Sequence, residues 1–204
     1  MDKKSLIIGY GNTYCHDDGV GFHIVNQIRR HLGFRELEPD EDGLDQLGHS
    51  LDTVVLHQLV PELIPTLGQY QAVIFVDAHM GTIPDEVKVS PVREELGFHA
   101  ITHHMSPGML LATARQTYHF APKAHLVSVK GENFDFGLGL TEPCRLRAEV
   151  AVEKILELIN PQDELTKVQH DMKVRLLSLS FQTCFGVLLL AHDNLHQTAC
   201  MNCP

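Results

Sequence analysis

A strand, a glycine-rich turn and a helix follow one another directly near the amino terminus, and this unit restricts the chain to α/β folds. Residues 5–8 form a short apolar run typical of a buried strand. A helical stripe of apolar residues follows, made up of Val20, Ile24, Val25, Ile28 and Leu32. The turn between the two elements, residues 9–21, therefore lies where open α/β sheets usually place a ligand.

The chemistry of this turn favours a cation over a phosphate. Asp17 and Asp18 place negative charge at the start of the helix, where they would repel a phosphate from the backbone N–H groups. A dinucleotide-binding enzyme would use Gly9 and Gly11, but Tyr14 occupies the place of the third glycine. For Asp17 we expect a helix cap, which leaves Asp18 as the acid that meets a ligand.

Apolar runs and helical patterns alternate along most of the chain. We predict further strands at residues 53–57, 72–76, 87–92 and 126–129, and helices at residues 61–67, from 106 onward and at 141–159, the last capped by Thr141. The predicted fold is α/β in three layers: a mostly parallel, twisted sheet of about five strands with helices on both faces. A strand order of 2-1-3-4-5 would make the first and third strands neighbours.

The end of the chain does not continue this pattern. We assign residues 1–160 to the α/β domain and residues 161–204 to a carboxy-terminal extension of unknown role, in which apolar residues occur without one clear period. The chain ends with a single Cys-x-x-Cys pair, Cys200 and Cys203. Without a second pair this motif is weak evidence for a metal or redox site, and we favour an incidental tail.

Composition excludes several classes of partner. The chain of 204 residues has 26 acidic and 16 basic residues and a formal net charge of -10, which argues against nucleic acid and anionic membrane. No apolar run approaches the roughly 20 residues that span a bilayer. The five cysteines do not form a secreted disulfide framework. We expect a monomeric cytoplasmic protein.

Three residues are the main candidates for the site. Asp18 follows the first strand, Asp77 follows the strand at 72–76, and His104 lies in the segment 102–106. If the first and third strands are neighbours, two carboxylates and an imidazole can converge at their carboxyl ends. A carboxylate that ends a buried strand is destabilising unless a cation compensates it. Oxygen and nitrogen donors together suit nickel or zinc, and three protein ligands leave positions open for a substrate.

Other residues stay open as donors. His103 adjoins His104, so the histidine assignment is uncertain by one residue, and His79 follows Asp77 closely enough to supply another nitrogen. Glu62 could line the same crevice, although a simple acid at a helix start is the plainer interpretation.

The sequence contains neither a Gly-x-Ser-x-Gly elbow nor a His-Glu-x-x-His helix. Cys15 lies near a helix start and is a possible nucleophile. The nearby charges of Asp17 and Asp18 are expected to raise the pKa of its thiol, which works against a thiolate.

Five segments of the chain, taken in order, form a specific set. They are Ile8-Gly9-Tyr10-Gly11-Asn12 with Asp17-Asp18-Gly19-Val20-Gly21; His57-Gln58-Leu59-Val60-Pro61-Glu62-Leu63; Val73-Ile74-Phe75-Val76-Asp77-Ala78; Thr102-His103-His104-Met105-Ser106-Pro107; and Gly137-Leu138-Gly139-Leu140-Thr141. With this set the sequence resembles the nickel-iron hydrogenase maturation endopeptidases over roughly residues 5–159.

This resemblance implies an activity and a role for each candidate. The family removes a carboxy-terminal extension from the hydrogenase large-subunit precursor after nickel insertion. Its two nickel-contacting acids fall on Asp18 and Asp77, and its histidine falls on His104. The precursor presents the nickel, for which zinc or another divalent ion could substitute, and Asp18 or Asp77 could activate water. A non-catalytic nickel-binding chaperone would use the same three residues and remains the alternative.

Overall fold

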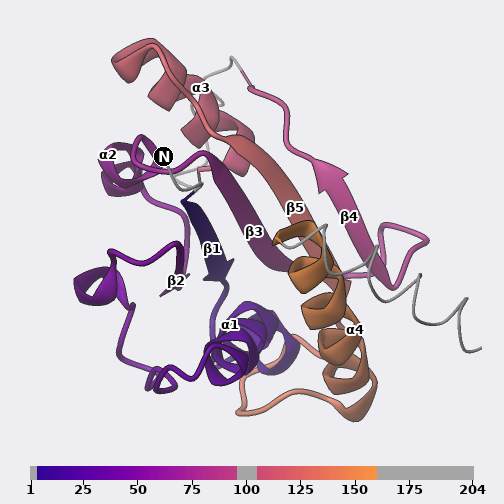
Figure 1. Ribbon diagram of the computed structural model, residues 1–204. Coiled ribbons are helices and arrows are strands. Elements are labelled where there is room, and N and C mark those ends of the chain that lie inside the picture. Colours follow the sequence, from indigo (N-terminus) through magenta and orange to yellow (C-terminus); the bar gives the residue numbers. More distant parts are fainter. Residues whose placement is uncertain (1–3, 96–104, 160–204) are drawn as a thin grey trace, which may run out of the picture. The chain divides into compact units, whose positions relative to one another are not determined.

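A five-stranded sheet in the order β2-β1-β3-β5-β4 organises the described residues, 4–95 and 105–159 of the computed structural model (Figure 1). The strands are β1 (Ser5–Tyr10), β2 (Leu51–Leu56), β3 (Ala72–His79), β4 (Val87–Pro91) and β5 (Lys123–Lys130). Strands β1, β2, β3 and β5 run parallel, and β4 pairs antiparallel with β5. The prediction of a mostly parallel five-stranded sheet is confirmed.

The predicted strand order is wrong at one edge, because β5 lies between β3 and β4. Only a short connection, residues 80–86, joins β3 to β4. A parallel return needs a crossover of a dozen or more residues, so β4 has to run antiparallel. Lys88 is exposed, and Pro91 lacks an N–H group, which suits an edge strand.

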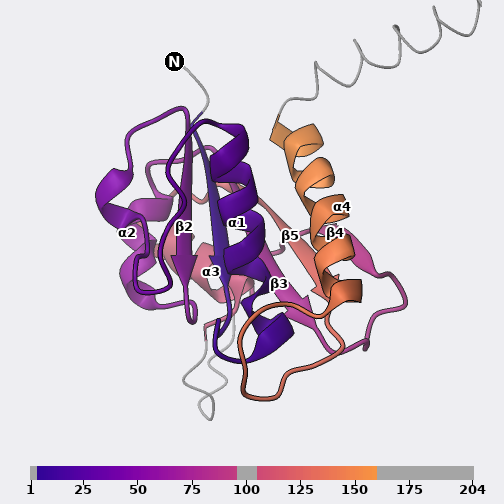
Figure 2. The ribbon, with the colours of Figure 1, turned by 90° about the horizontal axis from the view of Figure 1, so that it is seen from below.

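Helices cover both faces of the sheet, as predicted. The helices are α1 (Val20–His31), α2 (Ile64–Leu67), α3 (Pro107–Tyr118) and α4 (Glu142–Ile159), with shorter 3₁₀ turns η1 (His16–Gly19), η2 (Leu44–Gln46) and η3 (Pro61–Leu63). In Figure 2, α1 and α4 lie side by side over one face. Helices α2 and α3 pack on the opposite face. The result is a three-layer α/β/α sandwich.

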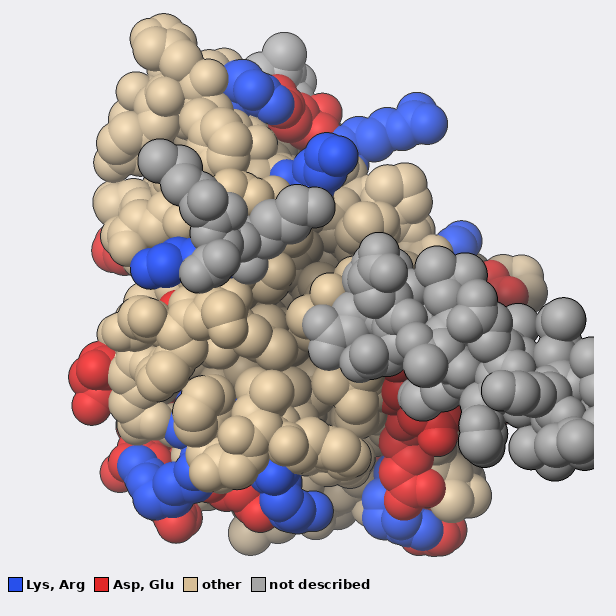
Figure 3. Space-filling model, viewed as in Figure 1, with Lys and Arg blue, Asp and Glu red and all other residues tan. Residues whose placement is uncertain are grey.

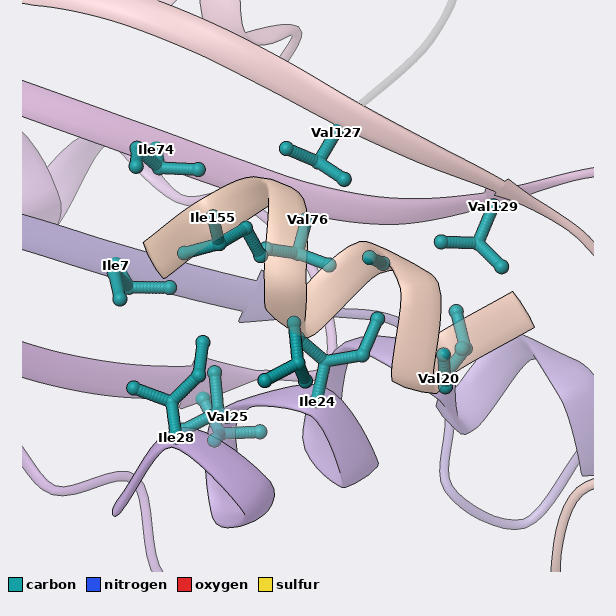
Figure 4. Packing of buried hydrophobic residues seen from close by; sticks show 14 of the residues in the cluster. Ile7, Val20, Ile24, Val25, Ile28, Ile74, Val76, Val127, Val129 and Ile155 are labelled. Atoms are coloured by element: carbon teal, nitrogen blue, oxygen red, sulfur yellow. The ribbon is translucent and has the colours of Figure 1, made fainter. Parts of the chain in front are cut away.

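The two faces bury separate apolar clusters. Between the sheet and the pair α1 and α4, Figure 4 shows interdigitated side chains from Ile7, Ile24, Val25, Ile28, Ile74, Val76, Val127 and Ile155. The other face buries Leu6, Phe75 and Leu110 completely. Each such side chain contributes about 1.5–3 kcal/mol through burial, so the sheet is a firm platform for the loops at its edges.

Several element boundaries differ from the prediction. The third strand extends to His79, so Asp77 lies within β3 and not after it. The predicted last helix agrees with α4: Thr141 directly precedes it, the Thr141 carbonyl accepts from the Arg145 N–H at 2.9 Å, and the Thr141 hydroxyl donates to Asp17. Residues 161–204, including Cys200 and Cys203, lie outside the described residues. Within the described part of the chain, no helix combines the length and hydropathy needed to cross a bilayer.

Charged groups of both signs share the surface seen in Figure 3, where red and blue side chains adjoin one another along its lower margin. Ion pairs join acidic and basic residues of the chain: Arg35 pairs with Glu41 at 2.8 Å, and Arg147 pairs with Glu86 at 2.8 Å. Exposed ion pairs add little to stability, because water and salt screen them. Their role is to limit local repulsion in an acidic chain.

Candidate functional site

A cleft of about 590 Å³ lies where the first turn leaves the sheet. Strands β1, β2 and β3 run in the same direction in Figure 2, so the segments that follow their carboxyl ends lie on one side of the sheet. The cleft is lined by Tyr10, Gly11, Asn12, Asp18, His57, Gln58, Leu59, Asp77 and Met105. The structure therefore brings Asp18 and Asp77, two of the three main candidates, to one cleft.

Backbone geometry aims Asp18 at this cleft. Gly11 has a φ of +134°, and a Cβ atom there would collide with the Asp18 carbonyl oxygen. The N–H group of Asn12 donates to Asp18 Oδ2 at 2.6 Å. A Cβ atom on Gly21 would lie 3.0 Å from the Val76 carbonyl oxygen, so glycine lets the start of α1 approach β3. These glycines give the turn its tight path.

Asp77 is the carboxyl group with the most perturbed acidity in the cleft. Its pKa is raised to about 6: burial is the largest cause and the nearby charge of Asp18 adds to it, while the Tyr10 hydroxyl and the Ala78 N–H oppose the shift. The Ala78 N–H donates to Asp77 Oδ1 at 2.8 Å. Burial and the charge of Asp77 also raise the pKa of the Tyr10 hydroxyl, which stays protonated as a donor.

Within the described residues, the two cleft carboxylates have no basic partner. In the part of the chain that the structure describes, neither Asp18 nor Asp77 forms an ion pair with Lys, Arg or His. A cation between or beside two neighbouring carboxylates stabilises their charged forms. With a pKa near neutrality, Asp77 is also able to accept a proton from water.

The predicted histidine ligand cannot be placed. His103 and His104 lie outside the described residues, although the next residue, Met105, lines the cleft. Among residues 4–95 and 105–159, no group of three or more His, Cys, Asp or Glu side chains is arranged to hold a metal ion. The described donor set is therefore the pair Asp18 and Asp77, which is too small for a closed metal site.

The other candidates do not line the cleft. His79 is only 8% exposed, and its Nδ1 accepts a hydrogen bond from the Gly81 N–H at 3.2 Å. Glu62 is exposed in the first turn of η3. Cys15 is a free thiol whose Sγ accepts from Asn12 Nδ2 at 3.3 Å. The structure thus supports the plainer interpretation of Glu62.

The prediction that Asp17 caps the following helix is wrong. Its side chain is fully buried and accepts four hydrogen bonds of 2.7–3.1 Å, from the N–H groups of Glu132, Asn133 and Thr141 and from the Thr141 hydroxyl. Burial alone would raise the pKa of Asp17, but these donors outweigh it and lower the pKa. Asp17 therefore clamps the first turn to the loop that precedes α4.

Four further residues line the cleft that were not predicted as site residues: Tyr10, Asn12, His57 and Gln58. His57 and Gln58 are exposed and directly follow β2, which is the neighbour of β1 in the sheet. The sequence signal that could have found His57 and Gln58 is their position directly after a strand, because the carboxyl ends of neighbouring parallel strands lie on the same side of the sheet. Tyr10 and Asn12 flank Gly11 in the first turn and also line the cleft, but only the acids of this turn were predicted to meet a ligand.

Comparison with known proteins finds solved structures with a similar fold. No family model matches the chain, and no curated protein matches it. The solved structure of the hydrogenase maturating endopeptidase HybD from E. coli is similar over 78% of this chain and 93% of its own, with a TM-score of 0.56 and 20% identity. The [NiFe] hydrogenase maturation protease HycI from Thermococcus kodakarensis covers the same shares with a TM-score of 0.53 and 18% identity.

A further structure, an endopeptidase from Escherichia coli, covers 78% of this chain and 93% of its own with a TM-score of 0.54 and 23% identity. These proteins share the three-layer α/β fold of this chain over nearly their whole length. The chain therefore has the fold of the hydrogenase maturation endopeptidases.

Proposed function

We propose that this protein is a hydrogenase maturation endopeptidase, which removes a carboxy-terminal peptide from a nickel-loaded large-subunit precursor. The observation that carries the proposal is the pair Asp18 and Asp77, which line one cleft without a basic partner among the described residues. The ordered motifs and the shared fold agree with it.

Nickel belongs to the substrate in this proposal. Asp18 and Asp77 would meet a nickel ion that the precursor already holds, with His104 as the third contact. The ion would then identify precursors that are ready for cleavage, and zinc or another divalent ion could replace it in experiments.

The cleft has the dimensions and chemistry for a peptide segment. Its volume of about 590 Å³ falls in the range of about 300–1,000 Å³ that small ligands occupy, so it would take a stretch of extended chain and not a folded domain. Gly11 and Asn12 bring backbone to its wall, where a substrate chain can approach closely.

Asp77 is the better general base of the two acids. Hydrolysis joins the oxygen of water to the carbonyl carbon, breaks the C–N bond, and transfers a proton from water to the leaving amine. A carboxylate whose pKa is about 6 in the free protein can accept this proton at neutral pH and pass it to the leaving amine. The Tyr10 hydroxyl interacts with the same carboxylate and would hold its orientation.

The test mixes the purified protein with nickel-loaded and with nickel-free precursor and follows the mass of the large subunit. We expect loss of a carboxy-terminal peptide from the nickel-loaded form only. Asp85→Asn, at an exposed position away from the cleft, serves as the matched acid-to-amide control for the cleft variants.

Each outcome has a distinct meaning. An unchanged mass of the nickel-loaded precursor would end the peptidase proposal. Tight binding of that precursor without cleavage would identify the protein as a nickel-binding chaperone. Cleavage of both precursor forms at the same rate would keep the peptidase and remove nickel as the recognition element.

A further inference from the structure

Three large apolar side chains are exposed on two neighbouring segments beside the site. Phe136 is 85% exposed and Leu138 is 73% exposed, both in the loop before α4, and Tyr14 in the first turn is 45% exposed. We call these three residues the apolar patch. Single exposed apolar residues are common, but a group of them on adjoining segments often marks an interaction site.

The backbone beneath the apolar patch is held in place by hydrogen bonds. The Gly137 N–H donates to the Tyr14 carbonyl at 2.8 Å, and the His16 N–H donates to the Gly137 carbonyl at 3.0 Å. The His16 ring contacts the Gly139 carbonyl through Nδ1 at 3.0 Å. The two segments thus pair as a short parallel bridge between Cys15 and Gly137.

Steric fit fixes the same contact. A Cβ atom on Gly137 would collide with the His16 imidazole, so any other residue would require this ring to move from its contact with the Gly139 carbonyl. The four hydrogen bonds that Asp17 accepts hold the two ends of the loop, at residues 132–133 and at 141. The loop is therefore ordered although its apolar side chains face water. Because these side chains are not buried, they add no hydrophobic stabilisation to the fold.

We propose that the apolar patch is the docking surface for the precursor, where Phe136, Leu138 and Tyr14 contact an apolar segment of it next to the cleavable peptide. This inference rests on the proposed function. It names the surface that recognises the protein part of the substrate, in addition to the acids that would meet its nickel.

Continuity with the cleft identifies the occupant. One short turn carries both surfaces: Gly11, Asn12 and Asp18 line the cleft, and Tyr14 belongs to the apolar patch. A precursor bound at Asp18 would therefore lie next to the turn that carries Tyr14. Three anchoring side chains are far fewer than the 20–30 residues per side of a stable complex, and they suit a substrate that has to leave after cleavage. Aromatic anchors of this kind dominate the energy of many interfaces.

The kinetic test uses the double variant Phe136→Ser with Leu138→Ser in the full chain. We expect the KM for nickel-loaded precursor to rise about tenfold or more while kcat at saturation stays within twofold. Leu146→Ser is the control, since Leu146 is 50% exposed in α4, outside the two segments that carry the apolar patch. A KM within twofold of the wild-type value, or an equal rise in the control, would overturn the proposal.

A crosslinking test identifies the occupant directly. Phe136 is replaced by the photoreactive p-benzoylphenylalanine, and the full chain is irradiated with nickel-loaded precursor. A crosslinked product with the summed mass of protein and precursor supports the proposal. A product with twice the mass of this chain, or an internal crosslink to residues 160–204, shows that a second copy or the chain's own end covers the patch, and overturns it.

Measurements on the wild-type protein distinguish a failure of the proposed function from a failure of the docking surface. If wild-type protein neither binds nor cleaves the precursor, the proposed function fails and the named occupant fails with it. If wild-type protein cleaves normally and the double variant does so with unchanged KM, only the docking surface is wrong.

Discussion

Asp17 and Asp18 are adjacent in the chain, yet their carboxylates meet opposite surroundings. Asp17 is fully buried and accepts four hydrogen bonds from the loop before α4. Asp18 is half-buried, accepts one hydrogen bond from Asn12, and faces the cleft with Asp77. The first is a closed structural contact, and the second is open to a ligand.

Asp52 repeats the closed arrangement elsewhere in the fold. It lies in β2 and accepts hydrogen bonds from the Tyr70 hydroxyl at 2.7 Å and from the N–H groups of Gly48 and His49. Burial raises its pKa, but these donors outweigh burial and lower the pKa, as at Asp17. Asp77 shows the reverse shift, to about 6.

The difference teaches which carboxylates serve the fold and which wait for a partner. Where donors converge on a buried acid, the charged form is stabilised and the acid contributes to stability. Where burial and a second acid dominate, as at Asp77, the charged form is destabilised in the free protein. A cluster of the second type in a cleft is typical of a functional site.

The largest predicted effect breaks the open pair. Asp77→Asn should lower processing of nickel-loaded precursor by at least about a thousand-fold, because the amide carries no charge and cannot accept the proton from water. The measurement is the mass of the large subunit over time. Near-normal processing would remove Asp77 from the site, while Asp85→Asn should process like the wild type.

The second prediction breaks the closed contact. Asp17→Ala should lower the free energy of unfolding by about 2–4 kcal/mol, because three backbone N–H groups and one hydroxyl lose their acceptor. The lowered pKa of Asp17 means that this contribution is present above its unfolded pKa and is lost as pH falls through the folded pKa. Urea unfolding at pH 7 measures the change.

The control for this prediction is Asp85→Ala, at an exposed position, which should change stability by less than about 0.5 kcal/mol. If Asp17→Ala unfolds with the same free energy as the control, Asp17 is not a clamp. Processing by Asp17→Ala should also weaken, since Asp18 loses its rigid neighbour.

The local sequence predicted much of the fold because the apolar runs that form β1 and β3 carry their own signal. The apolar stripe of α1 did the same through its helical period. The edge of the sheet was not predicted, because strand direction depends on the length of the connection between β3 and β4 and on where β5 inserts. The apolar periodicity of a segment reveals neither the direction of a strand nor its neighbours in the sheet.

The candidate site shows the same limit. The convergence of Asp18 and Asp77 follows from two neighbouring parallel strands, so their common cleft was predictable once β1 and β3 were paired. The role of Asp17 was not, because its donors lie 115 to 124 residues further along the chain. Local sequence shows an acid at a helix start, and only the folded chain shows what it binds.

The third prediction sharpens the contrast through stability. Asp77→Asn should raise the free energy of unfolding at pH 7 by about 1–3 kcal/mol, because it removes a buried charge. The folded pKa of about 6 lies above the unfolded value of 3.8, so the folded state binds the proton more tightly. The destabilisation by the carboxylate is therefore complete above about pH 6 and disappears below about pH 4.

Urea unfolding of Asp77→Asn and of the wild type at pH 7 and pH 4 tests this sign. A gain that is present at pH 7 and absent at pH 4 would agree with it. An equal stability difference at both pH values would show that the raised pKa is not its cause. Loss of processing together with a gain in stability would mark Asp77 as functional.

The smallest predicted effect concerns the second closed carboxylate. Tyr70→Phe should lower the free energy of unfolding by about 1 kcal/mol, because Asp52 loses one of its donors and keeps the others. The lowered pKa of Asp52 means that its contribution is present above the unfolded pKa and is lost as pH falls, so the difference from the wild type should shrink toward acid pH. Tyr118→Phe, at an exposed position, is the matched control and should be neutral. Equal effects of the two substitutions at pH 7 would show that the Tyr70 hydrogen bond does not stabilise Asp52. Asp17 would then be the one acid in this comparison whose hydrogen-bond donors stabilise the fold.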